Sequence, residues 1–257
     1  MKRIAAYSAT ILLGLCLIAA PKTPAADNVP VLLELFTSEG CSSCPPADKL
    51  LETLDRSQPI TGADLIVLSE HVDYWNHDGW ADPWSSATNT ARQREYQKHF
   101  KLDGSYTPQL VVDGESELVG SDAKGTRNAV TKAIRDPKLP ISISSPEREN
   151  DRLKVHLEIP SSEQGSGNAT VYVALADEQD QSHVSGGENG GHTLNHVAVV
   201  RAFGAVGMLS KGQQFTKDIT IPLKPDMGAS GLRVVAFVQD KATFRVMGVA
   251  QQRLSKL

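Results

Sequence analysis

Short apolar runs and helical periodicities alternate along residues 30–137. The strand-like runs lie at 31–36, 65–68, 110–112 and 117–119. The helical patterns lie at 47–54, 86–100 and 122–136. Asp113-Gly114 separates the last two runs and predicts a hairpin, while the first two runs are typical of buried parallel strands. The order β-α-β-α-β-β-α predicts an α/β domain over residues 30–137.

A different pattern begins after residue 139. Strand-like runs separated by polar turns lie at 141–144, 153–159, 170–176, 196–203, 215–223, 232–238 and 244–250. Seven such runs predict an all-β sandwich, Ig-like in outline, over residues 140–257. The segment 137–140, which holds two prolines, is the expected linker between the two domains.

Residues 1–26 have the pattern of an export signal peptide. Lys2 and Arg3 precede an apolar run at 11–20, and small residues near Ala25 offer a cleavage site. An uncleaved anchor is the alternative, although the run is short for a membrane span. If the signal peptide is cleaved, we expect a periplasmic or secreted protein without a stable membrane anchor. Such a protein is located in an oxidising compartment.

The charge balance argues against a nucleic-acid partner. The formal net charge of the 257-residue chain is −4, and it becomes −7 once Lys2, Arg3 and Lys22 leave with the signal peptide, which contains no acids. We find no basic patch of the kind that binds phosphate backbones.

Cys41 and Cys44 are the most informative residues of the chain. The third cysteine, Cys16, falls in the expected signal peptide, so the mature protein would contain only this Cys-x-x-Cys pair. The pair follows an apolar strand and precedes a helix that can begin at Pro45. The positive end of a helix favours a thiolate, the form that attacks disulfides. Cys41 is then the expected nucleophile and Cys44 the thiol that resolves a mixed disulfide.

Other chemistry is open to the same two thiols. They could bind copper(I), form a short structural disulfide, or supply half of a zinc site. Structural zinc usually needs four ligands, and the second cysteine pair of such a site is absent from the sequence. We therefore expect no zinc site and no cofactor, whereas copper(I) stays an alternative.

Thr107-Pro108 lies directly before the strand-like run at 110–112. A cis peptide bond at this proline would place the preceding backbone against the two thiols. An ordinary trans proline at the start of a strand is the alternative.

All three tryptophans fall in one insertion after the second predicted strand. Tyr74, Trp75 and Trp80 are candidates for an aromatic wall that binds substrate beside the thiols, with Trp84 nearby. The alternative is a loop anchored by its own aromatic side chains. The Gly-rich segment 185–192 is either a cover for the thiols from the second domain or a surface turn.

The motifs together resemble a known family. The segments 34–48, 71–75 and 106–109 are similar to motifs of DUF1223, a family of exported bacterial proteins without an assigned function. Residues 31–136 resemble the thioredoxin-like superfamily, because strand, Cys-x-x-Cys, helix, strand, Thr107-Pro108, hairpin and helix follow in that order. The resemblance implies a thioredoxin-like domain, and it leaves the activity open.

The resemblance also points to Glu34 in the strand before the motif. Thioredoxins keep a buried acid there, so Glu34 is the candidate for moving the Cys44 proton. A strand residue that pairs with a polar neighbour is the alternative. One departure is that Gly40, rather than tryptophan, precedes Cys41.

The favoured function is an exported thiol–disulfide oxidoreductase that acts on protein thiols or on a redox partner protein. Its expected site contains Cys41, Cys44, Thr107, Pro108 and Glu34. The alternatives are a copper(I)-binding protein or metallochaperone that uses the same cysteines, and a non-catalytic binding module with a structural disulfide.

We predict that the exported protein lacks residues 1 to about 26, because the charged start, apolar run and small residues form a cleavable signal. Intact-mass analysis of exported protein measures this. A mass that retains Met1 would contradict it.

Overall fold

The computed structural model describes residues 28–77, 79–164, 167–228 and 231–254. The expected signal peptide therefore lies outside the described residues, as does the alternative of an uncleaved anchor. Among the residues that are described, no helix is both long and apolar enough to cross a membrane.

The first half of the chain forms the expected elements in the expected order. They are β1 (Val29–Thr37), α1 (Pro45–Ser57), β2 (Ala63–His71), α2 (Ala87–Phe100), β3 (Gln109–Val112), β4 (Ser116–Val119) and α3 (Ala123–Ala133). β1 pairs in parallel with β2 and antiparallel with β3, which forms a hairpin with β4. Asp113 and Gly114 have φ of 51° and 72° at this turn, as the Asp-Gly pair predicts.

Alternating residues of β1 face two different layers. Leu33 packs with Leu51 of α1 and Val130 of α3 on one face of the sheet. Phe36 packs with Tyr96 of α2 on the other face. Both faces of β1 are covered, which explains its nearly continuous apolar sequence.

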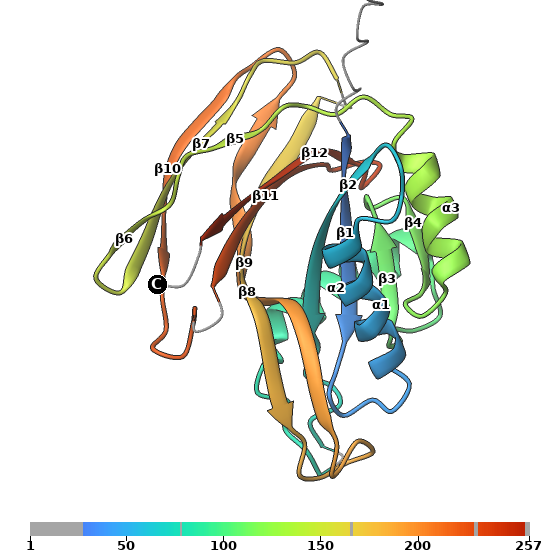
Figure 1. Cartoon of the computed structure of the whole chain (residues 1–257). Helices are drawn as coiled ribbons and strands as arrows, with labels where there is room; N and C mark the ends of the chain where they lie inside the picture. The colour runs from blue at the N-terminus through green and yellow to red at the C-terminus, as the bar shows by residue number, and fades with distance from the viewer. Residues whose placement is uncertain (1–27, 78, 165–166, 229–230, 255–257) are drawn as a thin grey trace, which may run out of the picture.

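The second half is almost entirely β-structure. Its strands are β5 (Ser142–Ile143), β6 (Glu147–Glu149), β7 (Arg152–Ile159), β8 (Asn168–His183), β9 (Thr193–Ser210), β10 (Phe215–Pro222), β11 (Leu232–Asp240) and β12 (Val246–Leu254). One mixed sheet has the strand order β12-β11-β8-β9-β2-β1-β3-β4 (Figure 1). A second sheet, β10-β7-β5, packs on its β8–β11–β12 end, with β6 paired to β7.

The expected α/β domain followed by a separate Ig-like sandwich is wrong as a fold class. The protein is mostly β, and one sheet runs through both halves of the chain because β9 pairs in parallel with β2 at Ser69 and Val199. The sequence pattern ends a strand at Ala176, where a polar run begins. The structure continues β8 through that run to His183, and β9 is 18 residues long, so the hairpin reaches the first half.

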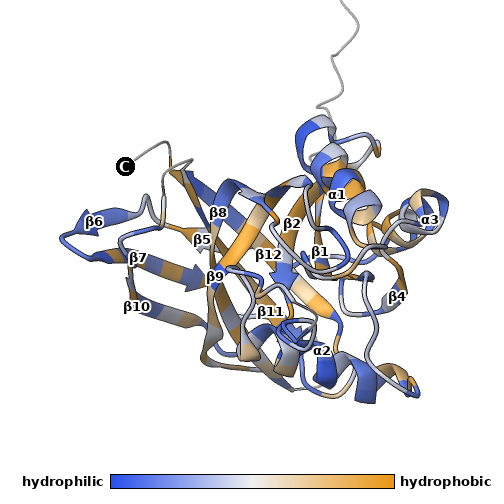
Figure 2. Cartoon of the chain, turned by 90° about the horizontal axis from the view of Figure 1, so that it is seen from below, coloured by the Kyte–Doolittle hydropathy of each residue, from blue (hydrophilic) through white to orange (hydrophobic). Residues whose placement is uncertain are grey.

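β11 has a buried residue at every position because both of its faces are covered. Val234 and Val238 pack with β7 and β10 in one core, whereas Val235 and Phe237 pack with β1 and β2 in another. An Ig-like sandwich would leave one of these faces to solvent. By contrast, β7 and β10 alternate hydrophilic and hydrophobic residues, as expected for strands with one face on the core and one face in solvent (Figure 2).

Arg233 of β11 ties the two halves together through buried ion pairs. Its guanidinium donates to both carboxylate oxygens of Asp55, near the end of α1, at 2.9 and 3.0 Å. It also donates to Glu178 of β8, at 3.1 and 2.5 Å. Burial opposes ionisation of Asp55, but the hydrogen bonds and charge of Arg233 outweigh it and lower the Asp55 pKa.

We predict that Arg233→Met destabilises the protein by about 3–5 kcal/mol, because the buried Asp55 carboxylate and the partly buried Glu178 carboxylate lose their fully buried partner. The difference from wild type should shrink as the pH falls through the lowered pKa of Asp55, where its carboxylate becomes protonated. Urea unfolding at several pH values measures both effects.

Arg253→Met is the matched control. Arg253 contacts the same two carboxylates at 2.8 and 3.4 Å, but its side chain is 46% exposed. Exposed ion pairs contribute about 1 kcal/mol or less. Equal losses in the two variants would contradict a special role for the buried arginine.

Candidate functional site

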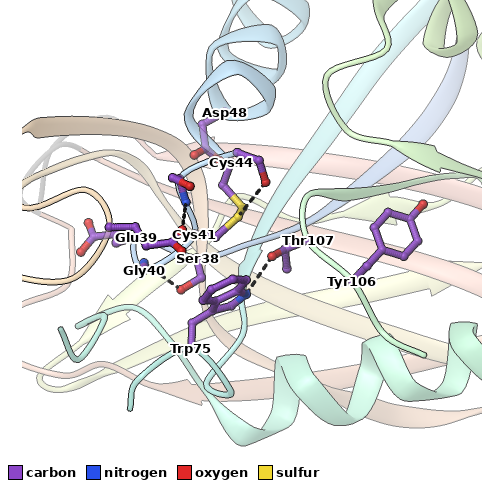
Figure 3. Close-up of a disulfide and its surroundings, with 12 residues drawn as sticks. Ser38, Glu39, Gly40, Cys41, Cys44, Asp48, Trp75, Tyr106 and Thr107 are labelled. Carbon is purple, nitrogen blue, oxygen red and sulfur yellow. Dashed lines mark hydrogen bonds between the residues drawn. A yellow bond between two sulfur atoms is a disulfide. The ribbon is translucent and has the colours of Figure 1, made fainter. Parts of the chain in front are cut away.

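Cys41 and Cys44 form a disulfide at the first turn of α1 (Figure 3). Cys44 is the N-cap residue of the helix, and its carbonyl accepts a hydrogen bond from the Asp48 amide at 3.1 Å. Both cysteines are almost fully buried, with exposed fractions of 1% and 0%, whereas Ser42 and Ser43 between them are exposed. The disulfide is thus covered even though the turn that carries it reaches the surface.

The Thr107-Pro108 peptide bond is cis, as the sequence analysis anticipated. Pro108 lies beside the start of α1, because a Cβ on Gly120 would be 3.1 Å from Pro108 Cβ and 3.0 Å from Ala47 Cβ. Thr107 Oγ1 accepts a hydrogen bond from Trp75 Nε1 at 2.8 Å. The two residues therefore lie between the aromatic insertion and the helix that carries the disulfide.

Two tryptophans of the insertion contact the motif segment. A Cβ on Gly40 would lie 3.1 Å from Trp75 Cβ. Glycine at this position therefore allows Trp75 to approach the backbone next to Cys41 (Figure 3). Trp80 Nε1 donates to Glu39 Oε2 at 2.8 Å.

The remaining aromatic residues of the insertion lie elsewhere. Tyr74 packs against the core of Phe36 and Tyr96, and Trp84 lies over the guanidinium of Arg201, with the Arg201 Cζ 5.0 Å from the ring centre. The insertion therefore contacts the segment next to Cys41 through Trp75 and Trp80, and it is anchored by Tyr74, while substrate binding by these residues stays a prediction.

Glu34 lies on the opposite face of β1 from α1. Its carboxylate accepts hydrogen bonds from Arg92 of α2 at 2.9 and 3.2 Å, and from the hydroxyl of Tyr96. Arg92 also donates to Gln239 of β11 at 2.7 Å. This network joins α2 to both halves of the sheet, and it gives Glu34 the pairing that the sequence analysis named as the alternative to proton transfer.

Instead, Asp48 is the buried acid on the disulfide side of β1. It is four residues after Cys44, so both side chains lie on the same face of the first helical turn (Figure 3). Burial raises the Asp48 pKa, and the neighbouring His196 and His71 side chains oppose this only in part. His196 Nδ1 lies 3.9 Å from Asp48 Oδ2.

Four other buried groups complete a polar cluster with Asp48. His71 Nδ1 and Asp82 Oδ2 are 2.7 Å apart, and His196 Nε2 and Glu39 Oε1 are 3.2 Å apart. The two imidazole rings meet edge to face, with centroids 4.6 Å apart. The cluster draws on α1, β2, the insertion and β9, so the fold assembles it from distant parts of the chain.

The pKa values of the cluster shift in different directions. Burial disfavours the charged forms of Glu39 and Asp82, but hydrogen bonds from their partners outweigh it and lower both pKa values. Burial of His71 would lower its pKa, yet the Asp82 carboxylate raises it. His71 Nε2, His196 Nδ1 and Asp48 Oδ1 have no hydrogen-bond partner among the described residues. Asp48 is therefore the cluster acid that most readily holds a proton.

The segment 185–192, between β8 and β9, covers the motif from the second half of the chain. Asn189 Nδ2 donates to the carbonyls of Glu39 and Cys41 at 2.8 and 3.0 Å. The Ser42 amide donates to Glu188 Oε2 at 2.9 Å. The expectation of a cover, rather than a free surface turn, is the one that these contacts support.

Sequence reasoning missed six members of this site: Glu39, Asp48, His71, Asp82, Asn189 and His196. A weak signal existed for His71 and Asp82, because His71 precedes the aromatic insertion and Asp82 lies within it. No signal in the sequence could place His196, since its position depends on the pairing of β9 with β2. Within the described part of the chain, no group of three or more His, Cys, Asp or Glu side chains has a metal-binding arrangement.

Comparison with known families identifies the chain. The profile of a family described as a protein of unknown function, DUF1223, matches residues 32–239. The protein belongs to this family, as its motifs indicated. No curated protein matches the chain.

Similar solved structures include a protein that matches over most of the chain. A crystal structure of a protein from Agrobacterium tumefaciens is 28% identical, with a TM-score of 0.66, and the match covers 88% of this chain and 94% of that one. A domain of the outer membrane lipoprotein Omp28 from Porphyromonas gingivalis is 22% identical with a TM-score of 0.32, covering 46% and 89% of the two chains. The sporulation control protein Spo0M from Bacillus subtilis has 10% identity and a TM-score of 0.30, covering 46% and 48%.

We predict that reduction of the Cys41–Cys44 disulfide raises tryptophan fluorescence, because a disulfide quenches a nearby indole and Trp75 packs beside the motif. Trp75→Phe should lose most of the increase. Trp84→Phe, the control, should keep it, since Trp84 stacks on Arg201 instead. Emission spectra before and after reduction measure the response, and an undiminished increase in Trp75→Phe would contradict the assignment.

Proposed function

We propose that this protein is an exported thiol–disulfide oxidoreductase that acts on protein thiols or on a redox partner protein. The observation that carries the proposal is the Cys41–Cys44 disulfide at the N-terminus of α1. Unpaired amides and the helix dipole at this position stabilise a thiolate, which makes the disulfide easier to reduce than a structural one. An exported protein meets substrates that need disulfides made or exchanged.

The surrounding elements support the same proposal. The order of β1, α1, β2, α2, β3, β4 and α3, with β1 between β2 and β3, is consistent with a relation of this half to the thioredoxin-like superfamily. Trp75 and Trp80 border the motif and would contact a bound substrate, whereas Tyr74 would support them from the core.

The reaction starts at Cys41, because the turn that carries it reaches the surface. The Cys41 thiolate attacks a substrate disulfide, a mixed disulfide forms, and one substrate sulfur leaves as a thiolate. The Cys44 thiolate then attacks Cys41 Sγ, which forms the Cys41–Cys44 bond and releases the second substrate sulfur. The substrate gains two electrons and the protein loses two; the reverse sequence oxidises a substrate dithiol.

Asp48 is the group that exchanges the Cys44 proton in this scheme. It lies one helical turn from Cys44 and is buried, and its raised pKa brings its proton affinity closer to that of a thiol. Glu34 instead stabilises the fold through Arg92 and Tyr96.

We predict that Cys41→Ser abolishes disulfide exchange with a protein substrate, measured by insulin reduction and by refolding of a reduced disulfide protein. The Cys41–Cys44 pair should have a reduction potential above roughly −300 mV, the limit typical of structural disulfides. A lower potential, or full activity in Cys41→Ser, would show that the disulfide is a fixed cross-link. Tight copper(I) binding without exchange would favour the metallochaperone instead.

Asp48→Asn tests the proton step separately. The formation of the mixed disulfide should be unchanged, while its resolution by Cys44 slows about a hundredfold and loses its acid-side pH dependence. Stopped-flow single-turnover measurements separate the two steps. Asp64→Asn, at a partly exposed position on β2, is the control.

A further inference from the structure

The β8–β9 hairpin extends past the rest of the sheet and ends beside the loop that joins β1 to α1 (Figure 1). Its tip, residues 185–192, is folded by its own hydrogen bonds. The Val184 amide donates to the His192 carbonyl at 2.9 Å, and the Gly191 amide donates to the Val184 carbonyl at 2.7 Å. We call this tip the cover.

The cover binds main-chain groups of the motif loop, and Glu188 also interacts with the Ser42 side chain. Asn189, which is 7% exposed, uses one amide group to donate to the carbonyls of Glu39 and Cys41. Glu188 accepts from the amide of Ser42. Two backbone carbonyls and one backbone amide next to the disulfide are therefore satisfied by side chains of the cover. The Asn189 side chain donates as a peptide amide would, and the Glu188 carboxylate accepts as a peptide carbonyl would.

The cover also packs closely on the aromatic insertion. A Cβ on Gly186 would lie 2.4 Å from the carbonyl oxygen of Gly79, so the two backbones touch without a side chain between them. The insertion and the cover thus contact each other, and each also contacts the segment 39–42, in which Cys41 is 1% exposed. Because Cys41 is 1% exposed, a substrate sulfur needs some of the surrounding residues to move before it reaches Cys41 Sγ, and the cover is the element bound to the Cys41 backbone.

We propose that the cover occupies the binding site of an extended polypeptide, which pairs with the Glu39 and Cys41 carbonyls and the Ser42 amide once the cover withdraws. This inference rests on the proposed function and names its substrate class. An extended chain offers main-chain N–H and C=O groups at a spacing suited to these partners, as in other cases of strand addition to exposed backbone. The cover is then displaced by substrate rather than by a separate regulator.

The first test measures reduction of Cys41–Cys44 by a water-soluble trialkylphosphine, which needs access to sulfur but no turnover. Asn189→Ala removes both hydrogen bonds of the cover to the carbonyls and should raise the rate about tenfold. Asn189→Asp places a carboxylate against the same carbonyls and should raise it further. Asn195→Ala is the control, since Asn195 pairs with Gln181 on the same hairpin and away from the motif.

The second test concerns the substrate class. In Cys44→Ser, the rate of mixed-disulfide formation at Cys41 is compared for a disulfide-containing peptide, the same peptide with N-methylated amides, and cystamine. Asn189→Ala should increase the rate of mixed-disulfide formation for the unmodified peptide by a factor at least five times larger than for the N-methylated peptide or cystamine. Only the unmodified peptide can donate main-chain hydrogen bonds to the freed carbonyls.

The outcomes separate the proposals. An unchanged phosphine rate in both Asn189 variants, with melting temperatures like wild type, would overturn the cover. A raised phosphine rate with equal gains for all three disulfides would overturn main-chain recognition of a peptide. A raised phosphine rate in a protein that lacks any exchange activity would overturn the proposed function and leave the cover standing.

Discussion

The fold depends on one buried arginine that holds α1 against the distant strands. Arg233 pairs with Asp55 near the C-terminal end of α1 and with Glu178 of β8. The start of α1 carries the disulfide, and the continuation of β8 past Glu178 carries the cover. Because the direct pairing of β2 with β9 involves only Ser69 and Val199, hydrogen bonding between strands cannot fix the two halves alone. Together with the apolar core that joins β11 to β1 and β2, the ion cluster holds the helix and the hairpin in position relative to each other, and so fixes where the cover meets the motif.

The local elements of the first half could be read from the sequence because local rules determine them. The Asp113-Gly114 turn and the helix that starts at Pro45 follow from backbone preferences. The shared sheet could not be read, because the part of β8 that reaches the first half is polar. Asp177 is buried in this part of β8, and its ion pair with Arg201 compensates for the buried charge. The hydrophobic periodicity of the sequence does not reveal that pairing. The continuous apolar run of β11 did contain the information, since a strand buried on both faces needs two covering layers.

The candidate site was predicted for the residues that are near one another in the chain. Cys41 and Cys44 could be assigned from spacing alone, whereas the choice between Glu34 and Asp48 required knowing which face of β1 meets α1. Residues of β1 alternate between faces, so an offset of one position moves a carboxylate to the far side of the sheet. Glu34 falls on that far side, where Arg92 neutralises it. Helical spacing of four puts Asp48 on the same face as Cys44, a relation visible in the sequence once the start of the helix is known.

The buried cluster also decides how the hairpin can move. Glu39 is held by Ser182 of β8 and His196 of β9, on either side of the cover. Withdrawing the whole hairpin would leave the Glu39 carboxylate with only Trp80 as a side-chain partner in the described structure, and an underpaired buried charge is costly. A movement confined to residues 185–192 breaks the contacts of Asn189 and Glu188 with the motif loop and of Gly186 with Gly79, and it leaves the cluster paired. Opening is therefore expected at the tip, with Val184 and His192 as its ends, while His196 stays beside Asp48.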